Sequence, residues 1–133
     1  MRKIEHIGIA VKSLTETAKV YEKLFDKPSY KTEVVESEGV ATMFFQLGES
    51  KIELLEATNE NSPIAKFIQK KGEGIHHIAF DVENIEEEIQ RLKSEGFSLI
   101  HEEAKFGADN KRIAFLHPKS TTGVLVELCQ ERD

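Results

Sequence analysis

The sequence has little of several features that would point to other classes of protein. Its single cysteine, Cys129, excludes an intramolecular disulfide. No apolar run approaches the roughly 18 residues of a membrane span, and no apolar signal-like segment follows Met1. The net charge is −6, so electrostatics gives no reason to expect a nucleic-acid partner. We therefore expect a cytoplasmic protein that binds neither nucleic acid nor membranes.

The 133 residues have the composition of one soluble globular domain. Hydrophobic residues make up 39% and charged residues 32%, a balance that disfavours intrinsic disorder. Residues 4–11 alternate and are rich in Ile and Val, which predicts a strand. Ser13, with Glu16 three residues later, forms a capping box that predicts the start of a helix. The expected buried stripe of this helix is Leu14, Ala18, Tyr21, Leu24 and Phe25.

The rest of the chain repeats this order of elements after a short linker. Strands are predicted over 30–36, 40–47 and 51–56, followed by a linker helix from Ser62-Pro63 to Gly72. The second series comprises a strand over 75–82, a helix from Asn84 to Gly96, and strands over 97–102, 112–117 and 123–129. We therefore predict an α+β fold with two βαβββ modules, residues 1–58 and 73–133, joined by a linker at 59–72.

The two halves also align in sequence. The segment 6–11, His-Ile-Gly-Ile-Ala-Val, matches 77–82, His-Ile-Ala-Phe-Asp-Val, and 52–55 matches 126–129. Self-similarity of this kind is a primary fold signal. In each half the first strand carries a His, and the last strand carries a Glu within an apolar run, where an uncompensated carboxylate is costly to bury.

Four residues, His6, Glu53, His77 and Glu127, could therefore converge on one cation. Two imidazoles and two carboxylates suit Ni, Co, Mn, Fe or Zn. A lone strand His or Glu more often has a structural or solvated role. The recurrence of both types at matched positions favours the metal site. His76 falls on the opposite strand face from His77, and structural or surface roles suffice for His101 and His117.

Several longer motifs add a family resemblance that covers essentially the whole chain. They are Glu-His-Ile-Gly-Ile-Ala at 5–10, Ser-Pro-Ile-Ala-Lys-Phe at 62–67, Gly-Glu-Gly-Ile-His-His-Ile-Ala at 72–79, and the His-Pro-Lys and Gly-Val-Leu-Val-Glu-Leu segments within 117–128. The sequence resembles the vicinal oxygen chelate (glyoxalase/bleomycin resistance) superfamily. The resemblance implies paired βαβββ modules that form a cupped sheet around one divalent metal, a homodimer, and His6, Glu53, His77 and Glu127 as the ligands.

The resemblance also implies an enzyme that transfers a proton through a metal-bound enediolate. The ligand quartet is similar to that of glyoxalase I (lactoylglutathione lyase), which converts a methylglyoxal–thiol hemithioacetal to the thioester, and this activity is our first expectation. Ni or Co is the expected metal, with Zn or Mn as alternatives. Glu127 is the first candidate for the base, with Glu53 as its counterpart.

The alternative activity is that of methylmalonyl-CoA epimerase, an isomerase that acts on an acyl-CoA. The sequence motifs quoted above resemble those of the epimerase more closely than those of glyoxalase I. Some epimerases carry a separate catalytic Glu at the position of Thr42 and Gln at the position of Glu53, and this chain departs from both. A non-catalytic drug-binding protein on the same fold is a further alternative, although such proteins often lack the full ligand set. Near Gly107, Lys105, Lys111 and Arg112 could contact a substrate carboxylate or phosphate, but solvated charges are commoner in loops.

Overall fold

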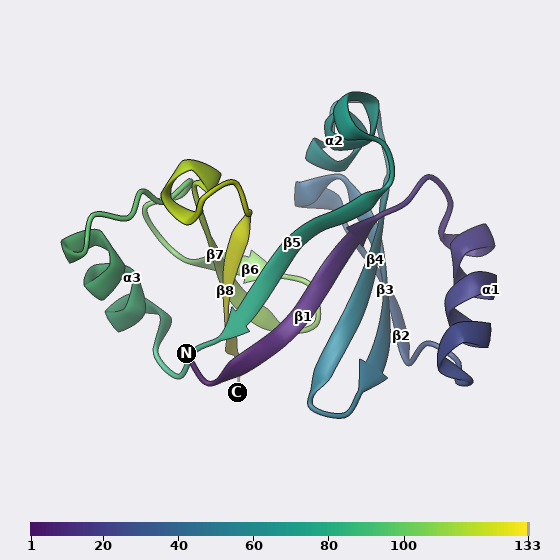
Figure 1. Cartoon of the computed structure of the whole chain (residues 1–133), viewed down its shortest axis with the longest axis horizontal. Helices are drawn as coiled ribbons and strands as arrows, with labels where there is room; N and C mark the ends of the chain where they lie inside the picture. The colour runs from purple at the N-terminus through teal and green to yellow at the C-terminus, as the bar shows by residue number, and fades with distance from the viewer. Residues whose placement is uncertain (133) are drawn as a thin grey trace. The chain divides into compact units, whose positions relative to one another are not determined.

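The structure, a computed structural model, describes residues 1–132 and has the predicted order of elements. The α+β class is confirmed. The elements are β1 (Lys3–Ala10), α1 (Leu14–Phe25), β2 (Lys31–Val35), β3 (Val40–Leu47), β4 (Ser50–Ala57), α2 (Pro63–Lys71), β5 (Gly74–Asp81), α3 (Ile85–Ser94), β6 (Lys105–Gly107), β7 (Lys111–Leu116) and β8 (Val126–Glu131) (Figure 1). Short 3-10 helices occupy Glu36–Glu38 and Pro118–Thr121.

Two compact units share the chain, and their boundaries fall inside β1 and β5. One unit comprises 7–76, and the other comprises 1–6 together with 77–133. In the first, β3 lies between β2 and β4 in antiparallel register, and β1 borders β4. In the second, the order is β1-β5-β8-β7-β6, with β5 and β8 parallel. The module boundaries that we drew at 58 and 73 stay a prediction.

The predicted helix starts are confirmed by their caps. The side chains of Ser13, Ser62 and Asn84 each accept a hydrogen bond from a backbone N–H in the first turn of the helix that follows. Helix α1 contributes Leu14 to a core with Phe45 and Leu54 from β3 and β4. Leu24, which we expected in the buried stripe, is 67% exposed, so the stripe is narrower than predicted.

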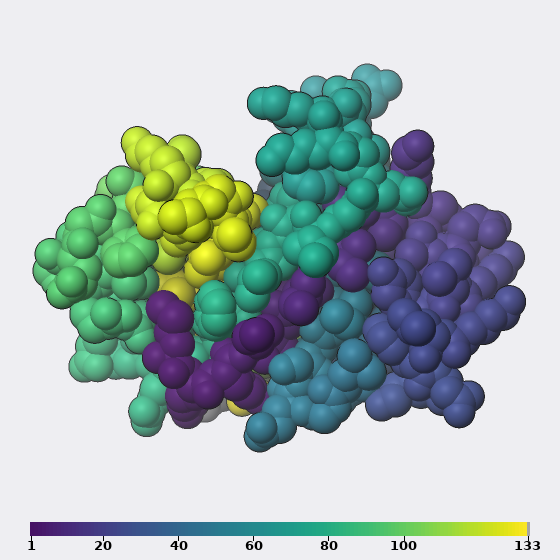
Figure 2. All heavy atoms as spheres, viewed as in Figure 1, coloured from purple at the N-terminus to yellow at the C-terminus, as the bar shows by residue number. Residues whose placement is uncertain are grey.

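Helix α3 supplies the core of the second unit. Its buried residues Ile85, Ile89 and Leu92 pack in one cluster with Leu116 of β7 and Leu128 of β8. In the space-filling view, yellow atoms near the C-terminus lie against the green atoms of the α3 region (Figure 2). The fold thereby holds β8, which carries Glu127, between β5 and β7.

The prediction of a strand over 97–102 is wrong. Only Leu99 forms a bridge there, opposite Leu116, and the short strand β6 instead pairs with the other end of β7. Two short segments therefore share the edge of β7 that one continuous strand would have occupied. The last strand also begins later than predicted, at Val126, because a 3-10 helix and a turn at Gly123 precede it.

Candidate metal centre

The two histidines that the repeat predicts face each other across neighbouring strands. The backbone N–H of Arg2 donates to the Asp81 carbonyl at 2.9 Å, which sets β1 against β5. His6, on β1, lies four residues after Arg2, and His77, on β5, lies four residues before Asp81, so the two histidines are adjacent across the strand pair. Their Nε2 atoms lie 3.0 Å apart, and both side chains are buried. The rings meet edge to face, at 87°.

Glu127 completes a group of three. Strand β8 runs parallel to β5 with Glu127 opposite Ala79, two residues along from His77. Its Oε1 atom lies 3.1 Å from Nε2 of His77 and 3.7 Å from Nε2 of His6. The carboxylate is 5% exposed. Three of the four predicted ligands therefore converge within the unit formed by 1–6 and 77–133.

The separations of these three atoms fit a common metal ion. Ligand atoms about 2.1 Å from one metal lie about 3.0 Å apart in octahedral geometry and about 3.4 Å apart in tetrahedral geometry. The observed separations of 3.0, 3.1 and 3.7 Å bracket these values. Two imidazole nitrogens and one carboxylate oxygen also match the preferences of Ni, Co, Zn and Mn. The donor set and its spacing are compatible with a divalent cation.

Burial and the two histidines act on Glu127 in opposite directions. Burial raises the pKa of the Glu127 carboxyl, but charge interactions and hydrogen bonds with His6 and His77 outweigh it, so the pKa lies well below its usual range. The other carboxylate oxygen accepts a hydrogen bond from the Cys129 thiol at 2.9 Å. Burial and the neighbouring Glu127 raise the pKa of this thiol. Cys129 is therefore a hydrogen-bond donor in the site rather than a thiolate.

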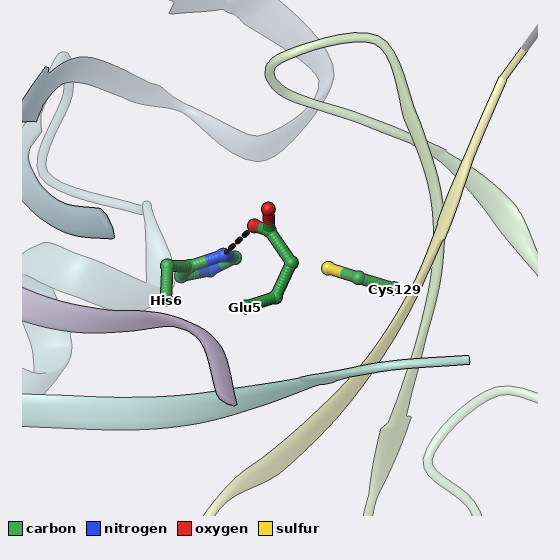
Figure 3. A group of neighbouring side chains, drawn as sticks. All are labelled: Glu5, His6 and Cys129. Carbon is green, nitrogen blue, oxygen red and sulfur yellow. Dashed lines mark hydrogen bonds and ion pairs between the residues drawn. The ribbon is translucent and has the colours of Figure 1, made fainter. Parts of the chain in front are cut away.

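Sequence reasoning missed the buried Glu5 beside the centre and treated Lys111 as a candidate substrate contact, whereas Lys111 is buried next to Glu5. The Oε1 atom of Glu5 lies 2.8 Å from Nδ1 of His6. A dashed line marks this contact in Figure 3. The Lys111 Nζ atom lies 3.9 Å from the other oxygen of Glu5 and 3.7 Å from Glu131. Strand alternation places Glu5 on the opposite side from His6, so the pattern gave no reason to pair them. The only signal in the sequence was position: Glu5 lies within the predicted strand 4–11, and Lys111 directly precedes the predicted strand 112–117.

Glu53, the fourth predicted ligand, belongs to the other unit. It lies on β4 opposite Phe44 and is 5% exposed. Its place in the ligand set stays a prediction. Thr42, at the position where some epimerases carry a base, is buried, and its hydroxyl donates to the Glu33 carbonyl at 2.9 Å. The neighbour of His77, His76, packs edge to face on Phe67.

The other basic and imidazole groups singled out from the sequence have partners of their own. Arg112 donates to Glu86 on α3, and Lys105 lies 3.3 Å from His101. The His117 side chain accepts a hydrogen bond from the Lys119 backbone. The expectation that Arg112 contacts a substrate therefore has no support in these contacts. None of the helices in residues 1–132 combines the length and apolar composition that a membrane span requires.

Comparison with known proteins places this chain in a family. Residues 5–115 match the model of the glyoxalase/bleomycin resistance protein/dioxygenase superfamily. The chain belongs to this superfamily, as its sequence motifs predicted.

The relatives narrow the resemblance further. The chain is 40% identical to the mitochondrial methylmalonyl-CoA epimerase of Homo sapiens, covering 96% of this chain and 73% of the human protein. It is 39% identical to the ethylmalonyl-CoA/methylmalonyl-CoA epimerase of Cereibacter sphaeroides, covering 96% and 97% of the two chains. A solved Streptomyces coelicolor methylmalonyl-CoA epimerase variant, in complex with 2-nitronate-propionyl-CoA, superimposes with a TM-score of 0.91 at 35% identity, covering 98% of this chain and 95% of that one. These relatives favour our alternative, the epimerase, over glyoxalase I.

Proposed function

We propose that this protein is a metal-dependent methylmalonyl-CoA epimerase. The observation that carries the proposal is the convergence of His6, His77 and Glu127 in a chain that is about 40% identical to epimerases over nearly its full length. The substrate proposed is an acyl-CoA with an acidic proton between a carboxylate and a thioester. The predicted homodimer and cytoplasmic location are part of this proposal.

His6, His77 and Glu127 would hold the metal, with Glu53 as the proposed fourth ligand. A bound divalent cation supplies positive charge that stabilises the oxyanion developing as the proton leaves carbon. Each imidazole can bind a metal through Nε2 only if that nitrogen carries no hydrogen. In the arrangement described, those atoms face each other at 3.0 Å, so one of them carries a hydrogen that metal binding must displace.

Epimerisation removes a proton from one face of a carbon and returns a proton to the other, so it requires two acid–base groups. Glu127 is the proposed base, and Glu53 is its proposed counterpart. The neighbouring histidines hold the pKa of Glu127 well below its usual range, so its carboxylate is ionised and can accept a proton. A bound cation would stabilise the substrate oxyanion that forms as the proton leaves. The Streptomyces epimerase variant binds 2-nitronate-propionyl-CoA, and a nitronate is a planar anion like the enolate that the proposed reaction would form.

The proposal is tested by assaying two substrates and by replacing each of two neighbouring histidines, His76 and His77, with alanine. Protein loaded with Co(II) is assayed for epimerisation of enantiopure methylmalonyl-CoA and for turnover of the methylglyoxal–glutathione hemithioacetal. We expect turnover of the CoA ester alone. His77→Ala should abolish both metal binding and epimerisation, whereas the control His76→Ala, which alters a ring packed on Phe67, should preserve both. Turnover of the hemithioacetal alone would restore glyoxalase I, and turnover of neither would indicate a binding protein.

A further inference from the structure

We propose that Glu5 is a positioning residue of the metal centre, which fixes the tautomer and orientation of His6, with Lys111 compensating its charge. The inference rests on the metal centre of the proposed function but not on its substrate. Glu5 belongs to neither the predicted ligand set nor the proposed acid–base pair. Its effect would be exerted through the imidazole of His6.

The hydrogen bond between the two neighbours determines which nitrogen of His6 is available. An ionised carboxylate can only accept, so the bond of 2.8 Å requires a hydrogen on Nδ1 of His6. The neutral ring then carries its lone pair on Nε2, the atom that faces His77 and Glu127. Carboxylates that bond to the distal nitrogen of a metal-ligating His fix its ring and raise its basicity. The sequence thus places the ligand and its orienting group side by side on β1.

The setting of Glu5 is costly for a residue with a purely structural role. Its side chain is 4% exposed, and a buried carboxylate loses its hydration. The Nζ atom of Lys111, on β7, lies 3.9 Å from the Oε2 atom of Glu5, and Lys111 is itself 7% exposed. Strands β1 and β7 thus each bury a charged residue, Glu5 against His6 and Lys111 against Glu5, where apolar side chains would suit a strand better. Delivering a preorganised Nε2 accounts for this cost.

Glu5, His6 and Cys129 also form a second group of potential metal ligands, drawn in Figure 3. His6 could offer that group either Nδ1, which is bonded to Glu5, or Nε2, which faces His77 and Glu127, so both nitrogens already have partners. The Cys129 thiol is likewise engaged, donating to Oε2 of Glu127. The geometry therefore favours Glu5 as a support for the first group over a separate sulfur-containing centre.

The tautomer of His6 is the most specific readout, because it is measured on metal-free protein without any assay. In a long-range proton–nitrogen correlation spectrum, wild-type His6 should show hydrogen on Nδ1 and a lone pair on Nε2. Glu5→Ala should convert His6 to a mixture of tautomers. A wild-type spectrum with hydrogen on Nε2 of neutral His6 would overturn the proposal.

Metal affinity supplies the second readout. Glu5→Gln should bind Co(II) about 10- to 100-fold more weakly than wild type. The control Glu56→Gln removes a carboxylate that caps Leu14 of α1 and should leave affinity unchanged. Should Glu5→Gln fail to fold beside Lys111, the charge-neutral pair Glu5→Gln/Lys111→Met gives the same comparison. Undiminished affinity in either folded variant would overturn the role of Glu5.

The visible spectrum of the same samples separates the remaining alternatives. Co(II) held by His6, His77 and Glu127 should give no sulfur-to-cobalt charge-transfer band, and Cys129→Ser should leave the spectrum essentially unchanged. A band that disappears in Cys129→Ser would place the ion at the sulfur-containing group and overturn the proposal. Absence of Co(II) binding by wild type would overturn the metal centre itself, whereas equal binding by wild type and Glu5→Gln would overturn only the inference about Glu5.

Discussion

The two units of the chain bury polar side chains in different ways. In the unit 7–76, Thr42 and Ser62 satisfy backbone groups, a common structural role. In the other unit, ionisable side chains face one another instead: Glu5, His6, His77, Lys111 and Glu127. The repeat is nearly symmetrical in sequence, yet among residues 1–132 the contacts described between buried charged side chains lie in the unit formed by 1–6 and 77–132, a feature typical of functional sites. Glu53 is the residue that tests this comparison, because it is a buried carboxylate in the unit 7–76.

The largest effect should follow from removing the carboxylate of the charged cluster. Glu127→Gln should lower kcat/KM for epimerisation by about 10²- to 10⁴-fold, because the amide cannot accept the proton. Glu103→Gln, at an exposed loop position of the same unit, is the matched control. Steady-state kinetics on metal-loaded protein measures both. A rate within threefold of wild type, roughly 0.7 kcal/mol, would rule out Glu127 as the base.

Apolar packing should not distinguish the units. Leu54 and Leu128 follow the two aligned glutamates, and each is fully buried. Replacing either by Ala should lower the free energy of unfolding by about 2–5 kcal/mol, since each substitution leaves a cavity in a packed core. Denaturant titration monitored by circular dichroism measures both values. A loss below about 1 kcal/mol in one variant alone would show that one core is much looser than the other.

Glu53→Gln tests whether the unit 7–76 contributes to the centre. The amide oxygen can still bind a metal but carries no charge, so Co(II) affinity should fall by about tenfold, less than for His77→Ala. Calorimetric titration of Co(II) into each variant makes the comparison. Unchanged affinity would remove Glu53 from the ligand set, and all the remaining proposed ligands would then belong to the unit formed by 1–6 and 77–133.

The smallest effect concerns the surface pair of Arg112 and Glu86. Arg112→Gln should lower the free energy of unfolding by less than about 1 kcal/mol at pH 7 and leave kcat unchanged. The hydrogen bond from Arg112 lowers the pKa of Glu86, so its stabilising effect is present above the unfolded pKa of about 4.3 and is lost as pH falls through the lower folded value. Thermal melts across this range measure it. A large fall in kcat would indicate that Arg112 contacts the substrate after all.

The sequence was sufficient for those features that recur in it. The matched His and Glu positions predicted that His6, His77 and Glu127 lie together, and capping residues located the three helices. That these residues and Glu53 bind a metal stays a prediction. Features that depend on pairing between strands were not accessible. The segment 97–102 has strand-like residues, but only one bridge forms because β6 takes the other end of β7.

Glu5 and its pairing with Lys111 were missed for a related reason. Alternation assigns a side to each residue but does not predict that a long side chain reaches the ring of its neighbour. Their partnership requires β7, whose residue Lys111 is more than a hundred positions away along the chain, to approach the start of β1. No local pattern encodes such a contact. The buried charges around a predicted ligand are therefore found only once the strands are placed.

The most direct test of the account is proton exchange in deuterium oxide. Enantiopure methylmalonyl-CoA is incubated with Co(II)-loaded protein, and the proton spectrum and the configuration at the substrate carbon are followed together. The account predicts loss of the carbon-bound proton signal with formation of both epimers, and neither change in His77→Ala. Retention of the proton and configuration by metal-loaded wild type, with turnover of the hemithioacetal under the same conditions, would contradict it.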